Sequence, residues 1–324
     1  MEQQAKQIYS KYKRNERLIT ACFFAAIVCF TVFGLYIAAV AVFGVYIIFA
    51  RRWSSKQYAK HILSILFTSL DGKKYKAVIS NEKHAKAQWE YLYACMYAGD
   101  YDEVVSFCTA ALDRKVNESI KCVMYLHLAK AYFETDDREN LRRVCVDYRT
   151  LVETSKNREQ LLSGSVNHID MYERFLGGDY EGALSLNEDR YEPEGEYTAK
   201  LNNSGVLFYS ALLLFRGGDI NQAKGLFEQI AADCPNLAAA DIAKRHLDFI
   251  NGETDTLVLP KAYADSASCK AMSDAYKKFM VNMRVKQIAL IIITIAAFFA
   301  AVFITPGQPS DESSASLLNG IFTI

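Results

Sequence analysis

The side chains that most often carry chemistry are present in this sequence, but they are not spaced for it. The histidines form no H-x-x-x-H pair that could hold a metal ion on one face of a helix; they stand at His61, His84, His127, His168 and His246. The sequence also lacks the G-x-x-x-x-G-K-[ST] phosphate loop, the G-x-S-x-G nucleophile turn and the G-x-G-x-x-G dinucleotide loop. We therefore expect no enzymatic activity, no metal ion and no cofactor.

Cysteines and carboxylates give no stronger signal. None of the eight cysteines forms a C-x-x-C pair, which argues against a zinc or redox site and agrees with a reducing compartment. The acidic stretch 187–197, NEDRYEPEGEY, lacks the D-x-[DN]-x-[DN]-G pattern of a calcium loop, so we interpret it as a solvated loop. The formal net charge is zero, so no nucleic-acid partner is expected.

A glycine-aspartate turn recurs between apolar helical runs. In RGGDINQAKGLFEQIAADCPN (216–236), two glycines precede an amphipathic helix, and within a helix each would cost about 1 kcal/mol relative to alanine. A tight turn with a positive φ explains them better. Related stretches are FLGGDYEGAL (175–184), YAGDYDEVV (97–105), the weaker FETDDRENL (133–141) and a degenerate LDGKKYKAV (70–78).

These turns predict a series of helical hairpins. The turn positions Gly99, Asp136, Gly178 and Gly218 are spaced by 37, 42 and 40 residues. All five prolines lie outside the candidate helices, as expected for an all-α chain, because a proline inside a helix costs about 3 kcal/mol. The apolar fraction of 51% suffices for a sizeable core.

The hairpin pattern resembles the tetratricopeptide repeat (TPR) family over roughly Trp53 to Gly252. That family stacks paired antiparallel helices, with small residues where they cross and a glycine at the turn. The matching residues are Ala129, Ala211, Tyr132, Gly99, Gly178, Gly218, Ala183, Ala223, Ala111 and Pro235. The chain departs from the family in its longer spacing, in the bulky Tyr93 and Leu176, and in a second turn without glycine. An unrelated all-helical solenoid or bundle is the alternative.

The resemblance implies a binding face rather than a catalytic site. In the family, the first helix of each hairpin lines a concave groove that binds peptides or protein segments. Aligning the repeats on the turn places aromatic residues and a cation on that face, and both are typical of binding hot spots. The predicted protein-binding residues are Trp89, Tyr93, Lys130, Tyr172 and Phe208. Core packing is the alternative for every aromatic, and we favour it for Phe133, Phe175 and Phe215.

Two uncharged stretches predict membrane spans, because about 20 apolar residues cross a bilayer as a helix. Residues 287–305 fit one span, whereas 18–50 are too long for one helix and short for two. The basic flanks of both stretches favour a cytoplasmic side for residues 1–17 and for the repeats, and the tail lacks Lys and Arg. We favour a hairpin turning near Gly34 over one long span. A cleaved signal is disfavoured because its apolar core would run only about 7–15 residues.

The sequence therefore predicts an all-α integral membrane protein with N-terminal and C-terminal transmembrane helices and a TPR-like solenoid. The expected parts are a basic cytoplasmic segment (1–17), a transmembrane hairpin or one long span (18–50), the repeat domain (51–252), a linker and juxtamembrane helix (253–286), a span (287–305) and an outside tail (306–324). The predicted function is a membrane-anchored, non-catalytic scaffold or adaptor that binds a protein or peptide segment. The alternative is an accessory subunit of a membrane transport or secretion complex.

Overall fold

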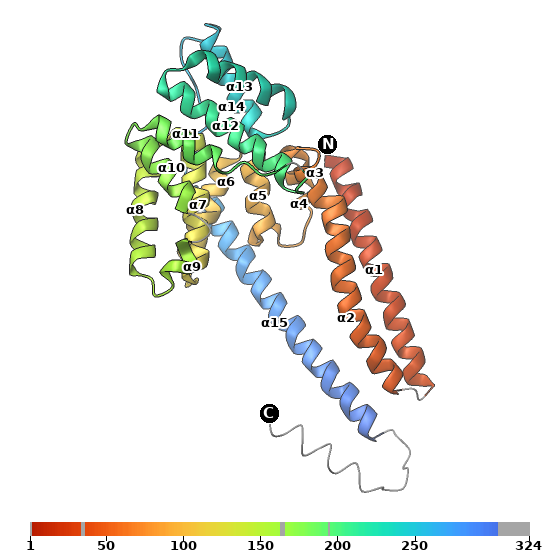
Figure 1. Cartoon of the computed structure of the whole chain (residues 1–324). Helices are drawn as coiled ribbons and strands as arrows, with labels where there is room; N and C mark the ends of the chain where they lie inside the picture. The colour runs from red at the N-terminus through yellow and green to blue at the C-terminus, as the bar shows by residue number, and fades with distance from the viewer. Residues whose placement is uncertain (1, 34–35, 163–165, 194, 304–324) are drawn as a thin grey trace. The chain divides into compact units, whose positions relative to one another are not determined.

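The computed structural model is all-helical in the part that it describes, residues 2–33, 36–162, 166–193 and 195–303, and it has no strand there (Figure 1). The elements are α1 (Glu2–Val32), α2 (Tyr36–Tyr58), η1 (Ala59–Leu63), α3 (Ser64–Phe67), α4 (Gly72–Ile79), η2 (Ala85–Ala87), α5 (Trp89–Ala98), α6 (Tyr101–Leu112), α7 (Glu118–Glu134), α8 (Arg138–Thr154), α9 (Arg158–Leu162), α10 (Val166–Leu176), α11 (Tyr180–Glu188), α12 (Ala199–Gly217), α13 (Ile220–Asp233), α14 (Ala238–Ile250) and α15 (Ser266–Phe303).

The chain divides into two compact units. The first contains Met1–Glu16 and Trp53–Phe279, and the second contains Arg17–Arg52 and Met280–Ile324. The boundaries fall inside α1, α2 and α15, so these helices each contribute to both units.

The predicted hairpin turns are confirmed by their backbone. Gly99, Gly178 and Gly218 have φ of 87°, 80° and 92°, and Asp136 takes the same left-handed region at 55°. Leu70 does so as well, at 50°, ahead of the degenerate copy. Positive φ is the conformation that ends a helix with a sharp turn, which is why glycine is preferred there.

The aspartate after each turn residue starts the next helix. Asp137, Asp179 and Asp219 accept hydrogen bonds from the backbone N–H three residues later, at 3.1, 3.0 and 3.1 Å. Such a cap satisfies one of the unpaired N–H groups at a helix start. Asp100 does not cap its helix and instead pairs with Lys76 Nζ at 2.7 Å. In these turns the residue with positive φ ends one helix, and the aspartate after it caps the start of the next.

Small residues are buried at the positions where the hairpin pattern predicts helix crossings. Ala129, Ala183, Ala211 and Ala223 are fully buried, as predicted from the hairpin pattern. A side chain without atoms beyond Cβ lets two helices approach closely, so these alanines set the spacing within and between the hairpins α7–α8, α10–α11 and α12–α13.

The series of hairpins returns on itself. Helix α14 packs against α5, and Lys73 Nζ of α4 forms an ion pair with Asp241 of α14 at 2.7 Å. Gly99 lies so close to Ala238 that a Cβ on the glycine would be 3.3 Å from the alanine Cβ. In an open solenoid each repeat contacts only its neighbours, so this contact between the first and last hairpins differs from the solenoid expected from the sequence.

The second unit contains the apolar halves of α1 and α2. Tyr46 Oη donates a hydrogen bond to Thr20 Oγ1 at 3.1 Å, and the rings of Phe23 and Tyr46 lie 5.0 Å apart, so the two helices pack together. The turn expected near Gly34 lies outside the described residues, as do residues 304–305 and the tail 306–324.

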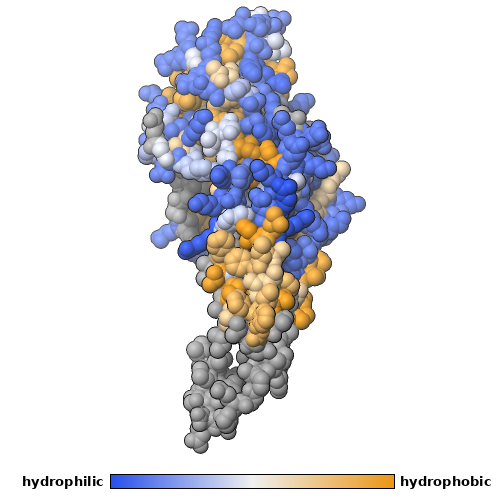
Figure 2. All heavy atoms as spheres, turned by 90° about the vertical axis from the view of Figure 1, so that its right-hand side faces the viewer, coloured by the Kyte–Doolittle hydropathy of each residue, from blue (hydrophilic) through white to orange (hydrophobic). Residues whose placement is uncertain are grey.

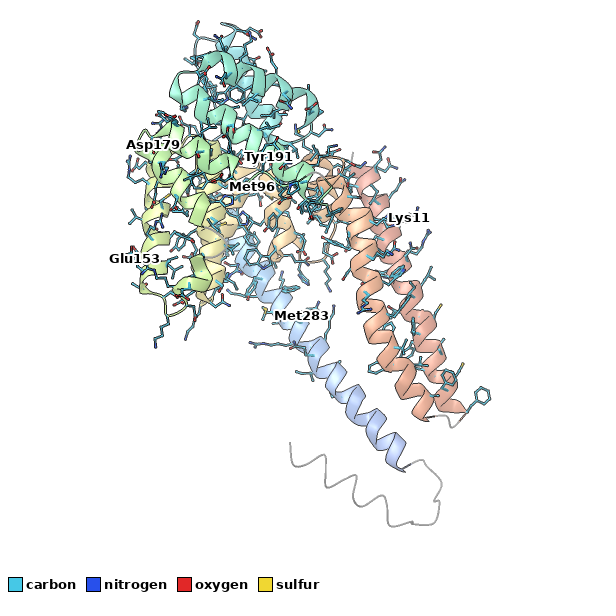
Figure 3. The ribbon with its side chains drawn as sticks, viewed as in Figure 1. Lys11, Met96, Glu153, Asp179, Tyr191 and Met283 are labelled. Carbon is cyan, nitrogen blue, oxygen red and sulfur yellow. The ribbon has the colours of Figure 1, made fainter. Side chains whose placement is uncertain are left out.

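Large apolar side chains remain exposed on this unit, and Figure 2 shows an apolar region among its described residues. On α1 and α2 they include Phe24 and Val45, with exposed fractions of 67% and 59%, and Phe33, directly after α1, is 78% exposed. Helix α15 begins at Ser266, within the segment 253–286 where a juxtamembrane helix was expected, and runs unbroken to Phe303. Met283 is one of the exposed side chains along it (Figure 3). Searched over its described residues, the structure contains no helix that is both long and apolar enough to cross a membrane.

Candidate binding cavity

A cavity of about 460 Å³ lies inside the first unit. Its walls come from α5, α7, α10 and α12, which are the first helices of the hairpins, from Arg190 after α11, and from residues 237–239 at the start of α14. Among the described lining residues, none belongs to α6, α8, α11 or α13. Met96 of α5, labelled in Figure 3, is one of the buried lining residues. The hairpins therefore present their first helices to a shared interior space.

Four of the five predicted binding residues line this cavity: Tyr93, Lys130, Tyr172 and Phe208. The fifth, Trp89, is not among the lining residues and lies at the first position of α5 with 38% of its surface exposed. The structure therefore brings together residues from α5, α7, α10 and α12 and leaves Trp89 apart from them.

The four lining residues differ in accessibility. Tyr93 is 41% exposed, whereas Tyr172 and Phe208 are each only 1% exposed. The Tyr172 ring packs against Phe133 at a centroid distance of 5.1 Å, and Phe133 also contacts Tyr209 at 4.9 Å. Tyr172 and Phe208 are thus mainly core residues beneath the cavity, and Tyr93 is the aromatic residue best placed to meet a ligand.

The three aromatics assigned to the core all pack in it or against it, and two of them are buried. Phe133 and Phe175 are 3% and 2% exposed. Phe215 is half-buried, and its ring lies edge-on to His246 at 5.0 Å and near Phe227 at 6.3 Å.

A buried carboxylate forms the polar centre of the wall. Glu134 accepts hydrogen bonds from Tyr101 Oη at 2.7 Å and from Tyr209 Oη at 2.9 Å, one on each oxygen. Lys130 Nζ lies 3.8 Å from the second of these oxygens. A buried charge is tolerated only when it is paired and hydrogen-bonded, and Glu134 satisfies both conditions.

Lys130 is a charged ammonium facing the cavity. Its Nζ lies 4.6 Å from the centre of the Tyr97 ring, and 26% of its side-chain surface is exposed to solvent. Burial acts to lower the pKa of Lys130, but Tyr97, Glu134 and Tyr172 more than compensate, so the pKa is raised above its ordinary value. The side chain is therefore a cation at neutral pH.

Arg190 provides a second cation from the segment after α11. Its Nη1 donates a hydrogen bond to Asn187 Oδ1 at 3.1 Å, and its guanidinium lies 5.6 Å from the centre of the Tyr209 ring. Across the described parts of the chain, no carboxylate forms an ion pair with Arg190. The guanidinium is thus held by an amide and an aromatic ring.

Two histidines are also part of the polar lining. His127 and His168 both face the cavity, and the His127 ring lies edge-on to Tyr93 at 5.1 Å. Burial lowers the pKa of each to about 3, and repulsion from Lys130 adds to the effect at both. Arg190 contributes further at His168. Both imidazoles are therefore neutral at pH 7 and offer one donor and one acceptor each.

Sequence reasoning missed several of these side chains, among them Glu134, Arg190 and Tyr209. Glu134 could have been found, because it stands four residues after Lys130 on the same helix face. Arg190 lies within the acidic stretch that we interpreted as a solvated loop, and nothing in that stretch marks it as facing inward. Tyr209 directly follows Phe208, and the pattern placed only the latter on the binding face.

The described residues contain no group of three or more His, Cys, Asp or Glu side chains that could hold a metal ion. No family model matches the chain, and no curated protein or solved structure is significantly similar to it.

Proposed function

We propose that this protein is a non-catalytic, membrane-tethered adaptor whose TPR-like hairpin domain binds a segment of another protein at the cavity. The observation that carries the proposal is that Tyr93, Lys130 and Arg190 line the same cavity. Aromatic residues and arginine are the side chains most enriched at binding hot spots. A volume of about 460 Å³ is within the range of sites that hold a compact ligand group.

The arrangement of the helices supports a TPR-like interpretation of this domain. The first helix of each hairpin faces the cavity and the second lies outside it, which is the division of roles that the resembled family uses. The packing of α14 against α5 closes the series, so the cavity is smaller than an open groove. A partner would therefore insert a side chain or a chain end rather than lie along the full array.

Membrane tethering is the second part of the proposal. Exposed apolar side chains of α1, α2 and α15 are the kind of surface that a bilayer covers, and Phe24, Val45 and Ile288 are examples that lie within the stretches predicted to span it. Basic residues flank these stretches on the side of the repeats, at Lys6, Lys11, Lys13, Arg14, Arg17, Arg51, Arg52, Lys56, Lys60, Lys277, Lys278, Arg284 and Lys286. The proposed orientation has the repeat domain in the cytoplasm and the tail outside.

Affinity capture of the full-length chain from its native membrane tests the binding function. Tyr93→Asp places a charge on the exposed aromatic of the cavity, and Ile220→Asp places one on the exposed surface of α13, where the side chain is 38% exposed. At least one protein should be captured by the wild type and by the Ile220 variant but lost with the Tyr93 variant. Equal capture by all three chains would contradict the proposal, provided that each keeps the helical content of the wild type.

A further inference from the structure

The parts of α1 and α2 that belong to the first unit pack side by side. Tyr12 Oη of α1 lies 3.2 Å from Ser54 Oγ of α2, and the rings of Tyr12 and Tyr58 are 5.9 Å apart. Tyr12 is only 7% exposed, whereas Lys11, labelled on α1 in Figure 3, and Arg14 are exposed. These two cations therefore lie on the side of α1 that faces away from α2.

Helix α2 repeats this arrangement. Lys56 stands between Ser54 and Tyr58, which both contact α1, and it is exposed. Successive residues of a helix are about 100° apart, so Lys56 lies on the side opposite to this contact. Lys11, Arg14 and Lys56 are called the exposed cations below.

The exposed cations differ from Lys13, the cation between them in sequence on α1. Lys13 Nζ lies 3.1 Å from Glu16 and 3.6 Å from Glu82, so its charge is paired within the first unit. Among the residues that the structure describes, no carboxylate forms an ion pair with any of the exposed cations. Their charges are therefore available to an external anion.

The exposed cations lie close to the uncharged stretch 18–50. Helix α1 is unbroken from Glu2 to Val32, so Arg14 precedes that stretch by about 6 Å along the helix and Lys11 by about 10 Å. Lys56 follows it by about 9 Å. A lipid headgroup layer is about 5–7 Å deep, and Lys and Arg extend their charged ends along apolar stems. With 18–50 in the hydrocarbon core, the three charges would lie in or next to the headgroups.

We propose that Lys11, Arg14 and Lys56 bind the headgroups of anionic phospholipids in the leaflet on the side of the repeat domain. The proposal rests on the membrane tethering proposed above and adds the class of lipid. Unpaired cations next to a membrane helix are attracted to an anionic lipid surface, and the attraction falls off within a Debye length. Because the three cations are spread over two helices, the lipids are selected by net charge rather than by headgroup shape.

Quenching of Trp53 fluorescence by brominated lipids measures which lipids surround the exposed cations, because Trp53 directly precedes Ser54 at the contact of α1 with α2. The chain has two tryptophans, and Trp89→Phe leaves Trp53 as the only one. The full chain is reconstituted into phosphatidylcholine bilayer discs that contain the same minor fraction of either brominated phosphatidylglycerol or brominated phosphatidylcholine. Phosphatidylglycerol should quench more strongly, with a local enrichment of about twofold or more. Equal quenching by the two lipids overturns the inference.

Two triple variants locate the effect on the chain. Lys11→Gln, Arg14→Gln, Lys56→Gln removes the exposed cations and should abolish the enrichment. The control variant, which should keep the enrichment, replaces by glutamine three lysines that are exposed in the repeat domain: Lys115, Lys156 and Lys244. Enrichment that persists in the first variant, or that is lost equally in both, overturns the assignment to α1 and α2.

Salt provides a test that needs no variant of these residues. High salt should bring quenching by phosphatidylglycerol close to that by phosphatidylcholine, because exposed charges are screened. A preference that is unchanged by salt contradicts binding by net charge and overturns the inference. Incorporation into discs of both compositions without a lipid preference overturns the inference and leaves the tethering standing. A chain that remains outside the discs of both compositions counts against both.

Discussion

The hydroxyl of Tyr209 donates a hydrogen bond of 2.9 Å to Glu134 across 75 residues of sequence. The other oxygen of Glu134 receives the hydroxyl of Tyr101, so one carboxylate at the end of α7 connects the start of α6 with the middle of α12. Glu134 is only 5% exposed. Since a buried carboxylate is costly unless its oxygens are satisfied, this contact favours the packing in which the hairpins surround the cavity.

Removing the Tyr209 hydroxyl should destabilise the domain. Tyr209→Phe leaves one buried oxygen of Glu134 with only Lys130 nearby, and an unsatisfied buried acceptor costs about 1–3 kcal/mol. The free energy of unfolding, measured by denaturant titration of the full chain in detergent, should fall by that amount. Tyr191→Phe is the control, because Tyr191 is 52% exposed. Equal stability of the two variants would mean that the carboxylate is not held by Tyr209.

Gly72 should not tolerate a side chain. A Cβ at this position would lie 2.1 Å from the backbone oxygen of Tyr97, so one of the two backbone segments must move. We expect Gly72→Ala to lower the free energy of unfolding by about 1–3 kcal/mol, the usual cost of overpacking. Gly225→Ala is the matched control in α13, where a Cβ meets nothing within 4 Å and the helix should gain up to about 1 kcal/mol. A change in the free energy of unfolding of the same sign in both variants would contradict the close approach of α4 to α5.

The two cavity histidines should make the protein less stable in acid. Their pKa in the folded state is about 3, well below the ordinary value of 6.5, so below pH 6.5 the unfolded chain binds protons that the folded chain does not. The contribution of the two histidines to the free energy of unfolding is therefore fully present above pH 6.5 and is lost as the pH falls towards 3. Between about pH 7.5 and pH 5 the loss is at most about 2 kcal/mol per histidine, less where solvent screens the ring. Denaturant titrations of His127→Gln, His168→Gln should show a shallower decline than the wild type, and an equally steep decline would contradict the partial burial of both rings.

The proposed membrane orientation predicts the behaviour of reporter fusions. A reporter that matures only outside the membrane should be active when fused after Ile324 and inactive when it replaces the chain after Trp53. The physical reason is the concentration of Lys and Arg on the side of the repeats. Activity of the Trp53 fusion would contradict both the hairpin and the cytoplasmic placement of the repeats.

The local features of the fold could be predicted from the sequence because they depend on neighbouring residues. A glycine followed by aspartate specifies a helix end and the next helix start within a few positions, and Gly218 with Asp219 forms such a turn. Ala223 could be assigned to a helix crossing because its distance from the turn is fixed. These positions need no information about the rest of the chain.

The closed arrangement and the accessibility of the site could not be predicted in this way. Tyr172 occupies the expected helix face, but Phe133 and Tyr209, far away in sequence, cover it. Arg190 faces the cavity through its contact with Tyr209, whereas its neighbours in sequence suggested a solvated loop. The packing of α14 on α5 depends on the summed geometry of every hairpin between them. Each of these features is set by contacts between distant segments, which have no local pattern.

The central claim is that a protein segment enters the cavity past Tyr93, and site-directed crosslinking in the native membrane tests it most directly. A photoreactive phenylalanine analogue replaces either Tyr93, at the cavity, or Tyr191, which is exposed but is not a lining residue of this cavity. The account predicts a crosslinked protein adduct from position 93 that is absent from position 191 and is lost when Lys130→Gln and Arg190→Gln are added. An adduct from position 191 alone, or an adduct at position 93 that survives loss of both cations, would contradict it.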